Sequence, residues 1–261
     1  MKALIYLRVD EKEMLHKFEF SLAEYDEMLR FFVDEKYSFC SFESLETSTK
    51  SVFLRHDVDS EMFLLADMAQ IEAHLGIRST YFLMTASTAY NLHSCEARKA
   101  IELLLENGHA IGLHYMNEDV SDEDIGGLIE DIAHHAFLLE RLTGTPISSF
   151  SFHQPRKHWL SQSVDVPNLI NVYDLESRWG IVYTSDTNRK WGTGHPVDLA
   201  TRSVEKMQVL VNPMWWTSDA TTANDCWQRV RNSVVNNLVE HWAIRERSFH
   251  SELAESLKIS D

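Results

Sequence analysis

Two aspartates separated by a single residue, Asp57 and Asp59, follow directly after the β-rich run Ser51-Val-Phe-Leu-Arg-His56. Side chains alternate along an extended chain, so both carboxylates project to the same side. Two carboxylates this close repel, and the pKa of one of them rises unless a cation lies between them. The spacing therefore indicates a divalent-metal site or a proton-transferring acid. The alternative is an acid that caps the next helix beside an ordinary surface acid.

A histidine ends another apolar run. His114 follows Ile111-Gly-Leu113, and Glu118 comes four residues later. Neutral imidazole and carboxylate are ligands that suit zinc and similar divalent ions. His114 is thus the second candidate ligand, and Glu118 is a third if residues 115–118 turn back helically. The alternatives are a structural histidine and a solvated acid ahead of a helix.

Three further apolar runs end in His153, Asp186 and Asn212. In α/β barrels the carboxyl ends of the strands converge on one face, and the active site is built there. We therefore expect all these strand ends to deliver their polar groups to one place. Asp186 is a candidate for binding substrate or for orienting a catalytic histidine, and Asn212 is a candidate for binding substrate.

Two adjacent tryptophans, Trp215 and Trp216, follow Asn212 and Pro213. Large aromatic rings on a loop either cover an edge of the core or stack on a ligand, and carbohydrate rings present apolar C–H faces that suit such stacking. Substrate binding is one interpretation of the pair, and core packing is the other. Arg55, just before the aspartates, either contacts substrate or pairs with an acid beneath the strand ends.

The elements that must position these residues alternate along the chain. Strands are predicted over residues 3–8, 51–56, 80–84, 110–114, 147–152, 181–184 and 207–211. Helices are predicted over residues 22–36, 61–75, 95–106, 121–142 and 222–253. Ser121-Asp-Glu-Asp124 resembles a capping box at the start of the fourth helix. The alternation indicates parallel βαβ units, and hence a distorted (β/α) barrel of about seven parallel strands.

We expect a single domain over residues 1–261, with 1–48 as a strand–helix extension and 222–256 as a C-terminal helix. The formal net charge of −16, from 40 acidic and 24 basic residues, argues against a nucleic-acid partner, which needs a basic surface. Three widely separated cysteines with no CxxC pair exclude a disulfide framework and a thiolate zinc site. No apolar run is long enough to cross a bilayer or to act as a signal sequence, so we expect a cytoplasmic protein. No feature indicates an oligomeric state.

Several of these segments resemble the polysaccharide deacetylase superfamily (carbohydrate esterase family four, the NodB-homology domain), and above all its divergent bacterial surface-polysaccharide branch. The strongest matches are Leu54-Arg-His-Asp-Val-Asp59, Ser79-Thr-Tyr-Phe-Leu83 and Asn107-Gly-His-Ala-Ile-Gly-Leu-His114. Weaker matches are Ser151-Phe-His-Gln-Pro155, Ser185-Asp-Thr-Asn188 and Asn212-Pro-Met-Trp-Trp216. Together they cover residues 50–216, most of the chain.

The resemblance implies a distorted barrel that removes an acetyl group from an amino sugar or polysaccharide precursor with the help of one divalent ion. Zinc is the expected ion, with iron, manganese, cobalt and nickel as alternatives. Of the two aspartates in the first motif, one is usually the general base and the other a metal ligand. We assign Asp57 as the base and Asp59 as the ligand, and the reverse assignment stays open. The second motif usually supplies two histidine ligands, which here are His114 and Glu118.

The last motif of the family usually carries a histidine as general acid, and this chain has Asn212 there. An amide cannot donate a proton as an acid, so either His153 takes that role or activity is weak or lost. One alternative function is therefore a catalytically degenerate carbohydrate-binding barrel. Others are a hydrolase of another small C–N amide bond and a partner-binding module without an active site.

Overall fold

Strand β2 (Ser51–Val58) is the centre of a parallel sheet and is buried along its whole length. Its apolar residues are typical of a parallel strand covered on both faces. Its neighbours are β3 (Thr80–Leu83) and β8 (Lys206–Val211), and the short β1 (Ser38–Phe39) pairs with its first two residues. In the computed structural model, the described residues are 20–43, 45, 49–60, 62, 64–116, 120, 121, 123–161, 164–216, 222–246, 249 and 251–259. The strand expected at 3–8 and the candidate ligand Glu118 lie outside them.

The strand order is β6–β5–β4–β3–β2–β8–β7, and every pairing between these strands is parallel. The remaining strands are β4 (Ala110–Tyr115), β5 (Ser149–Phe152), β6 (Ile170–Asn171) and β7 (Val182–Ser185). This is the cyclic order of a barrel that is open between β6 and β7, which do not pair within the described residues. The sheet forms a curled half-barrel with flanking helices, which confirms the predicted fold class.

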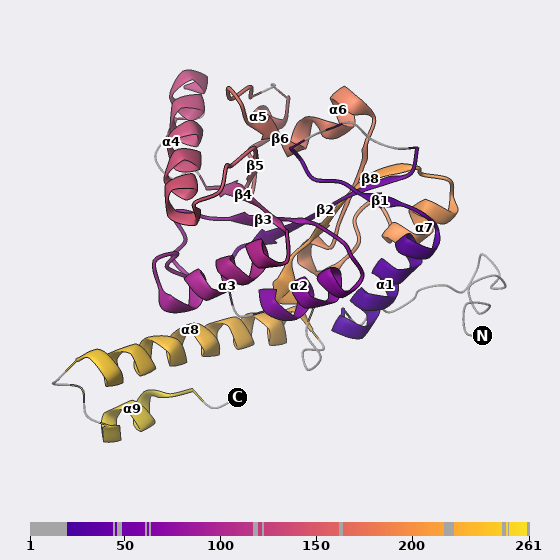
Figure 1. Cartoon of the computed structure of the whole chain (residues 1–261). Coiled ribbons are helices and arrows are strands. Elements are labelled where there is room, and N and C mark those ends of the chain that lie inside the picture. The colour runs from indigo at the N-terminus through magenta and orange to yellow at the C-terminus, as the bar shows by residue number, and fades with distance from the viewer. Residues whose placement is uncertain are drawn as a thin grey trace.

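Four helices follow the ranges expected from the sequence: α1 (Leu22–Asp34), α2 (Leu65–His74), α3 (Cys95–Glu106) and α4 (Ile125–Thr143). They flank the curled sheet, as Figure 1 shows. The expected starts of α2 (residue 61) and α4 (residue 121) were each wrong by one turn. The N-cap of α4 is Asp124 and not Ser121. The Asp124 carboxylate accepts the Gly127 N–H at 2.8 Å, and aspartate is itself a strong N-cap residue.

Shorter helices complete the connections: α5 (Lys157–Ser161), α6 (Leu175–Trp179), α7 (Pro196–Thr201) and the 3₁₀ turns η1 (Val172–Asp174), η2 (Thr187–Arg189) and η3 (Pro213–Trp215). The sequence patterns did not predict them, nor the strands β1 and β6. Each spans six residues or fewer, so none shows a full period of apolar residues.

The C-terminal segment differs from the single helix expected over 222–256. Helix α8 (Ala223–Arg245) ends where Glu246 takes an extended conformation, and a separate α9 (Ser251–Leu257) follows. The chain after α9 pairs with α8, because the Asn236 amide donates to the Ile259 carbonyl at 3.0 Å and accepts the Ile259 N–H at 2.9 Å. In Figure 1, α8 extends away from the sheet and α9 lies beside its far half.

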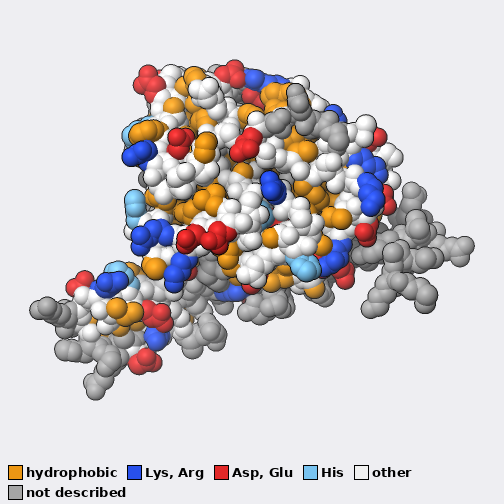
Figure 2. All heavy atoms as spheres, in the orientation of Figure 1, with side chains coloured by type: hydrophobic (Ala, Val, Ile, Leu, Met, Phe, Trp, Pro, Cys, Tyr) orange, Lys and Arg blue, Asp and Glu red, His pale blue; other side chains and the backbone are white. Residues whose placement is uncertain are grey.

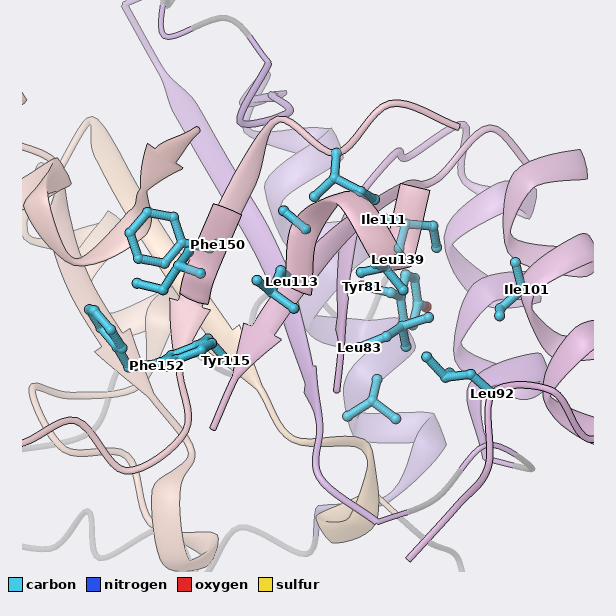
Figure 3. Close-up of a cluster of buried hydrophobic side chains, with 14 of the residues drawn as sticks. Tyr81, Leu83, Leu92, Ile101, Ile111, Leu113, Tyr115, Leu139, Phe150 and Phe152 are labelled. Carbon is cyan, nitrogen blue, oxygen red and sulfur yellow. The ribbon is translucent and has the colours of Figure 1, made fainter. Parts of the chain in front are cut away.

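Apolar side chains from the strands and helices form the core. Leu113 and Phe150 of the sheet lie in one buried cluster with Ile101 of α3 and Leu139 of α4 (Figure 3). A second cluster joins β2 and β8 to α1 and α8. A small third cluster, which includes Phe53 and neighbours from β3 and α6, packs inside the curl. The helices thus cover the outside of the sheet. Inside the curl, apolar residues pack beneath the polar residues at the strand ends.

The surface carries charges of both signs. On the face drawn in Figure 2, acidic and basic side chains are interspersed over the body of the protein. Among the described helices, none combines the length and the apolar character that a bilayer span requires.

Glu72 of α2 is fully buried and collects polar partners from α1, β2 and β3. Its carboxylate accepts hydrogen bonds from the Tyr25 hydroxyl at 2.6 Å and the Tyr81 hydroxyl at 3.0 Å. His56 Nε2 lies 2.8 Å from one carboxylate oxygen, and His109 Nδ1 lies 3.4 Å from the other. Because a buried charge needs such partners, this network fixes α1 and α2 against the outer face of β2.

Replacing Glu72 with glutamine keeps the side-chain volume and removes the buried charge. We expect Glu72→Gln to lose about 3 kcal/mol of unfolding free energy, because His56 and His109 lose their anionic partner. Urea denaturation at pH 7 measures the loss. Glu102→Gln, on the exposed side of α3, is the control and should leave stability nearly unchanged.

The same network makes stability depend on acid. Burial raises the pKa of Glu72, but His56, His109 and the Ser79 hydroxyl together lower it more, and the net shift is below the ordinary value of 4.5. The unfolded chain therefore takes up this proton first, so the contribution is present above pH 4.5 and is lost as the pH falls below it. Glu72→Gln should show a shallower acid dependence than the wild type. Equal slopes would contradict a charged Glu72.

Candidate metal centre

Three side chains from three strand ends meet at the carboxyl edge of the sheet. Asp59 follows β2, His114 lies near the end of β4, and His153 follows β5. Asp59 Oδ1 lies 3.0 Å from His114 Nε2 and 3.0 Å from His153 Nδ1, and the two nitrogens are 3.2 Å apart. In the described part of the chain, this is the one group of three or more such residues whose ligand atoms all lie within 4.8 Å of one another.

These separations fit a common divalent ion. Nitrogen and oxygen ligands lie about 2.1 Å from zinc, so two ligands at right angles are about 3.0 Å apart and two at the tetrahedral angle about 3.4 Å apart. The three observed distances, 3.0, 3.0 and 3.2 Å, fall in this range. Two imidazoles and one carboxylate are also a donor set that zinc accepts. The described residues at this site therefore fit a metal ion.

His114 is oriented by a neighbour on the next strand. Strands β4 and β5 pair with His114 opposite Ser151, and His114 Nδ1 lies 2.7 Å from the Ser151 hydroxyl oxygen. When Nδ1 carries the proton and donates it to Ser151, Nε2 keeps its lone pair for a metal. Such partners behind a ligand fix the ring and its tautomer. Nothing in the sequence motif alone indicated this role for Ser151.

The charges of the three residues are coupled. Burial raises the pKa of Asp59, but the hydrogen bonds with His114 and His153 outweigh it and hold the pKa well below its usual range. The hydrogen bond with Asp59 in turn raises the pKa of His153. The site thus stabilises a carboxylate anion beside two imidazoles, and such an anion attracts a cation.

Arg55 and Asp57 form a buried ion pair inside the curl, next to these ligands. The guanidinium donates to the two Asp57 oxygens at 3.1 and 2.7 Å, and Arg55 is fully buried. Its charge also faces the rings of Phe82, Tyr173 and Tyr183, 5.2 to 5.9 Å from their centres. Of the two interpretations of Arg55, the structure has the one in which it pairs with an acid beneath the strand ends.

Asp57 lies beside the ligand group without being part of it. One of its oxygens is 3.8 Å from His114 Nδ1, whereas Asp59 contacts the other nitrogen of the same ring. The two aspartates therefore have different surroundings, one held by an arginine and one by two histidines. Of the two aspartates, only Asp59 contacts both histidines of the group.

Asp186 and Asn212 are joined to each other rather than to the ligands. The buried Asp186 carboxylate accepts the Asn212 main-chain N–H at 3.0 Å, the Asn212 side-chain amide at 2.7 Å and the Trp216 indole N–H at 2.7 Å. Burial raises the pKa of Asp186 to about 7, although these N–H groups oppose the shift. The group ties the end of β7 to the turn η3 after β8.

Both tryptophans of the pair are packed inside the protein. Trp216 is 1% exposed and its ring lies against Phe20 and Tyr25, at 5.2 and 5.3 Å between ring centres. Trp215 is 5% exposed and lies against Trp227. Buried rings offer no open face to a sugar, so these placements agree with the core-packing interpretation of the pair.

The structure brings together three of the residues singled out in the sequence, Asp59, His114 and His153. The sequence analysis assigned Asp59 and His114 as metal ligands and His153 as a proton donor, and the His153 ring lies beside the two candidate ligands. These roles stay predictions. Glu118 lies outside the described residues, and its role as a ligand stays a prediction. A small pocket at this edge is lined by Asp57, Val58, Asp59, Ser60, Pro213 and Met214.

The Arg55–Asp57 pair can be tested by replacing its guanidinium. We expect Arg55→Lys to lose about 2 kcal/mol or more of unfolding free energy, because an ammonium cannot donate to both oxygens or stack on the rings. Thermal and urea unfolding measure the change. Arg30→Lys alters an exposed pair with Asp26 and serves as the matched control, with stability expected to stay the same. Equal stability of both variants would show that the bidentate geometry at Arg55 is unimportant.

Comparison with known proteins finds likeness only among solved structures. No family model and no curated protein matches the sequence. The chain is similar to the Streptococcus pyogenes deacetylase PplD in complex with acetate, with a TM-score of 0.45 and 14% identity over 79% of this chain and 85% of that one. It is also similar to the Xyl-CE4 domain of a xylanase from a Trinervitermes trinervoides hindgut metagenome, with a TM-score of 0.44 and 13% identity over 76% and 93% of the two chains.

A third similar structure is a CE4 family pseudoenzyme from Bacillus anthracis, with a TM-score of 0.42 and 15% identity over 71% of this chain and 62% of that one. These three solved structures are thus a deacetylase, a CE4 domain of a xylanase and a CE4 pseudoenzyme.

Proposed function

We propose that this protein is a metal-dependent hydrolase that removes an acetyl group from an amino sugar or a polysaccharide precursor. The observation that carries the proposal is the close approach of Asp59, His114 and His153 at the carboxyl edge of the half-barrel. A cytoplasmic location and a carbohydrate substrate are parts of the same proposal. The sugar is supported by the motif resemblance and not by the buried tryptophans.

Asp59, His114 and His153 would hold the ion, and Glu118 is the remaining candidate ligand. When bound, a divalent ion supplies Lewis-acid chemistry to an acyl carbonyl and to a water molecule. Three protein ligands are the number found in catalytic zinc sites, which keep a position for water or substrate. His153 is thus reassigned from proton donor to ligand, because its Nδ1 lies 3.0 Å from Asp59 and 3.2 Å from His114 Nε2.

Asp57 is the general base in this proposal. Arg55 fixes its carboxylate beside the ligands, where it accepts a proton from the attacking water. The water oxygen bonds to the acyl carbon, the C–N bond breaks, and the departing nitrogen needs a proton. Asn212 cannot donate one as an acid, so Asp57 returns the proton it has taken.

Metal content tests the ligand set. We expect about one transition-metal ion per purified wild-type chain, and a loss in Asp59→Ala, His114→Ala and His153→Ala, because each removes one of three ligands. Elemental analysis after zinc loading measures it, with His74→Ala, an exposed histidine of α2, as the control. Asp57→Asn should keep the metal and lose acetate release. Full metal content in His153→Ala would return that residue to the role of proton donor.

The alternative function is a carbohydrate-binding barrel without catalysis. One observation favours it: the side-chain amide of Asn212 donates a hydrogen bond to Asp186 and offers no acid to a leaving group. Asn212→His restores the residue type that the family motif usually has. We expect wild type to release acetate from N-acetylglucosamine oligomers with added zinc, and Asn212→His to do so at least about tenfold faster, since a positioned acid contributes 10²–10⁴-fold. No release by a metal-loaded wild type, with release only by the variant, would contradict the proposal and support a binding barrel.

A further inference from the structure

Tyr90 lies in the loop between β3 and α3, and its hydroxyl joins two main-chain groups near the candidate metal centre. The hydroxyl accepts the Met84 N–H at 2.7 Å and donates to the Val58 carbonyl at 2.9 Å. Met84 is the first residue after β3, and Val58 is the last residue of β2. The side chain therefore bridges the carboxyl ends of two neighbouring strands.

Direct pairing between these strands ends at this point. The last partners in the register of β2 and β3 are Val58 and Leu83, and the Tyr90 hydroxyl joins the main chain just beyond them. The hydroxyl thus stands between the two strands where Asp59 leaves β2. Without it, Met84 N–H and the Val58 carbonyl must either approach each other or lose their partner, and both outcomes move the strand end.

The Val58 carbonyl belongs to the same planar peptide unit as the nitrogen of Asp59. A hydrogen bond to that carbonyl therefore restricts the direction in which the Asp59 main chain leaves the sheet. The Asp59 carboxylate must lie within about 2.0–2.2 Å of an ion to bind it, so small rotations of this peptide change its fit. The distances of 3.0 Å from Asp59 to both His114 and His153 depend on that direction.

The loop that carries Tyr90 is itself fixed by local hydrogen bonds. The Ser87 hydroxyl oxygen accepts the N–H groups of Ala89 at 3.1 Å and Tyr90 at 3.4 Å. At the other end, Ser94 caps α3 by accepting the Ala97 N–H at 3.0 Å. These hydrogen bonds order the turn, so the Tyr90 hydroxyl has a fixed position between Met84 and Val58.

We propose that Tyr90 is a positioning residue for Asp59, which sets the direction of this ligand through the Val58 peptide. The inference rests on the proposed function, because it concerns the affinity of the same metal site. The Tyr90 hydroxyl donates its hydrogen bond to the Val58 carbonyl, so its effect on the direction of Asp59 passes through the main chain.

Tyr90→Phe removes only the hydroxyl oxygen and tests this role. We expect zinc affinity to weaken about tenfold, as for other groups behind metal ligands, and the absorption spectrum of the cobalt-loaded protein to change. Competition titration with a chelating dye measures the affinity. The matched control is Tyr37→Phe, which removes a hydroxyl that donates to the Val204 carbonyl at 2.7 Å before the amino end of β8. The control should bind zinc and cobalt as the wild type does.

The outcomes separate this inference from the proposed function. A wild type that binds zinc, with Tyr90→Phe equal to it in affinity and cobalt spectrum, overturns the role of Tyr90 alone. Equal weakening in Tyr37→Phe also overturns it, because the effect would then follow from any lost tyrosine bond. A wild type without affinity for zinc or cobalt overturns both. Thermal unfolding of each variant ensures that all titrations use folded protein.

Discussion

The ion pair between Arg55 and Asp57 is the interaction around which the inside of the half-barrel is arranged. A fully buried guanidinium is unfavourable unless a carboxylate and suitable neighbours compensate it, and here Asp57 and three aromatic rings do so. These rings come from β3, η1 and β7, which lie on different sides of the curl. The Arg55 guanidinium therefore links β2 to both ends of the sheet, through Tyr173 after β6 and Tyr183 of β7.

The opposite face of β2 carries a second buried charge. His56 lies between Arg55 and Asp57 in the chain and points to Glu72 of α2, because side chains alternate along a strand. One strand thus connects a cation inside the curl to an anion outside it. A shift of β2 by one residue would turn the Arg55–Asp57 pair away from its aromatic rings and His56 away from Glu72. The register of β2, and with it the placement of Asp59 at the strand end, is strongly specified.

Much of this could be predicted from the sequence, since the strand ends carry their polar residues in a local pattern. The partners across the sheet could not. His114 meets Ser151 only because β4 and β5 are neighbours in register, and no local spacing reports that pairing. The same holds for His153, which lies 39 residues from His114 and still contacts it. The burial of Trp216 depends on η3 turning its ring onto α1, which the adjacent tryptophans alone do not indicate.

The Asp186 group bears on how a reaction at this site would handle protons. Its carboxylate is surrounded by N–H donors from Asn212 and Trp216, and donors favour the ionised form, whereas burial raises its pKa to about 7. A proton on Asp186 would compete with these N–H groups for a carboxylate oxygen. The contacts of Asp186 therefore suit a structural link between β7 and η3 better than a group that exchanges protons during a reaction. In the proposed function, proton transfer is then left to a carboxylate beside the candidate ligands, and Asp57 lies there, 3.8 Å from His114 Nδ1. A single carboxylate that first accepts and then returns a proton needs no histidine at position 212, which makes Asn212 compatible with catalysis.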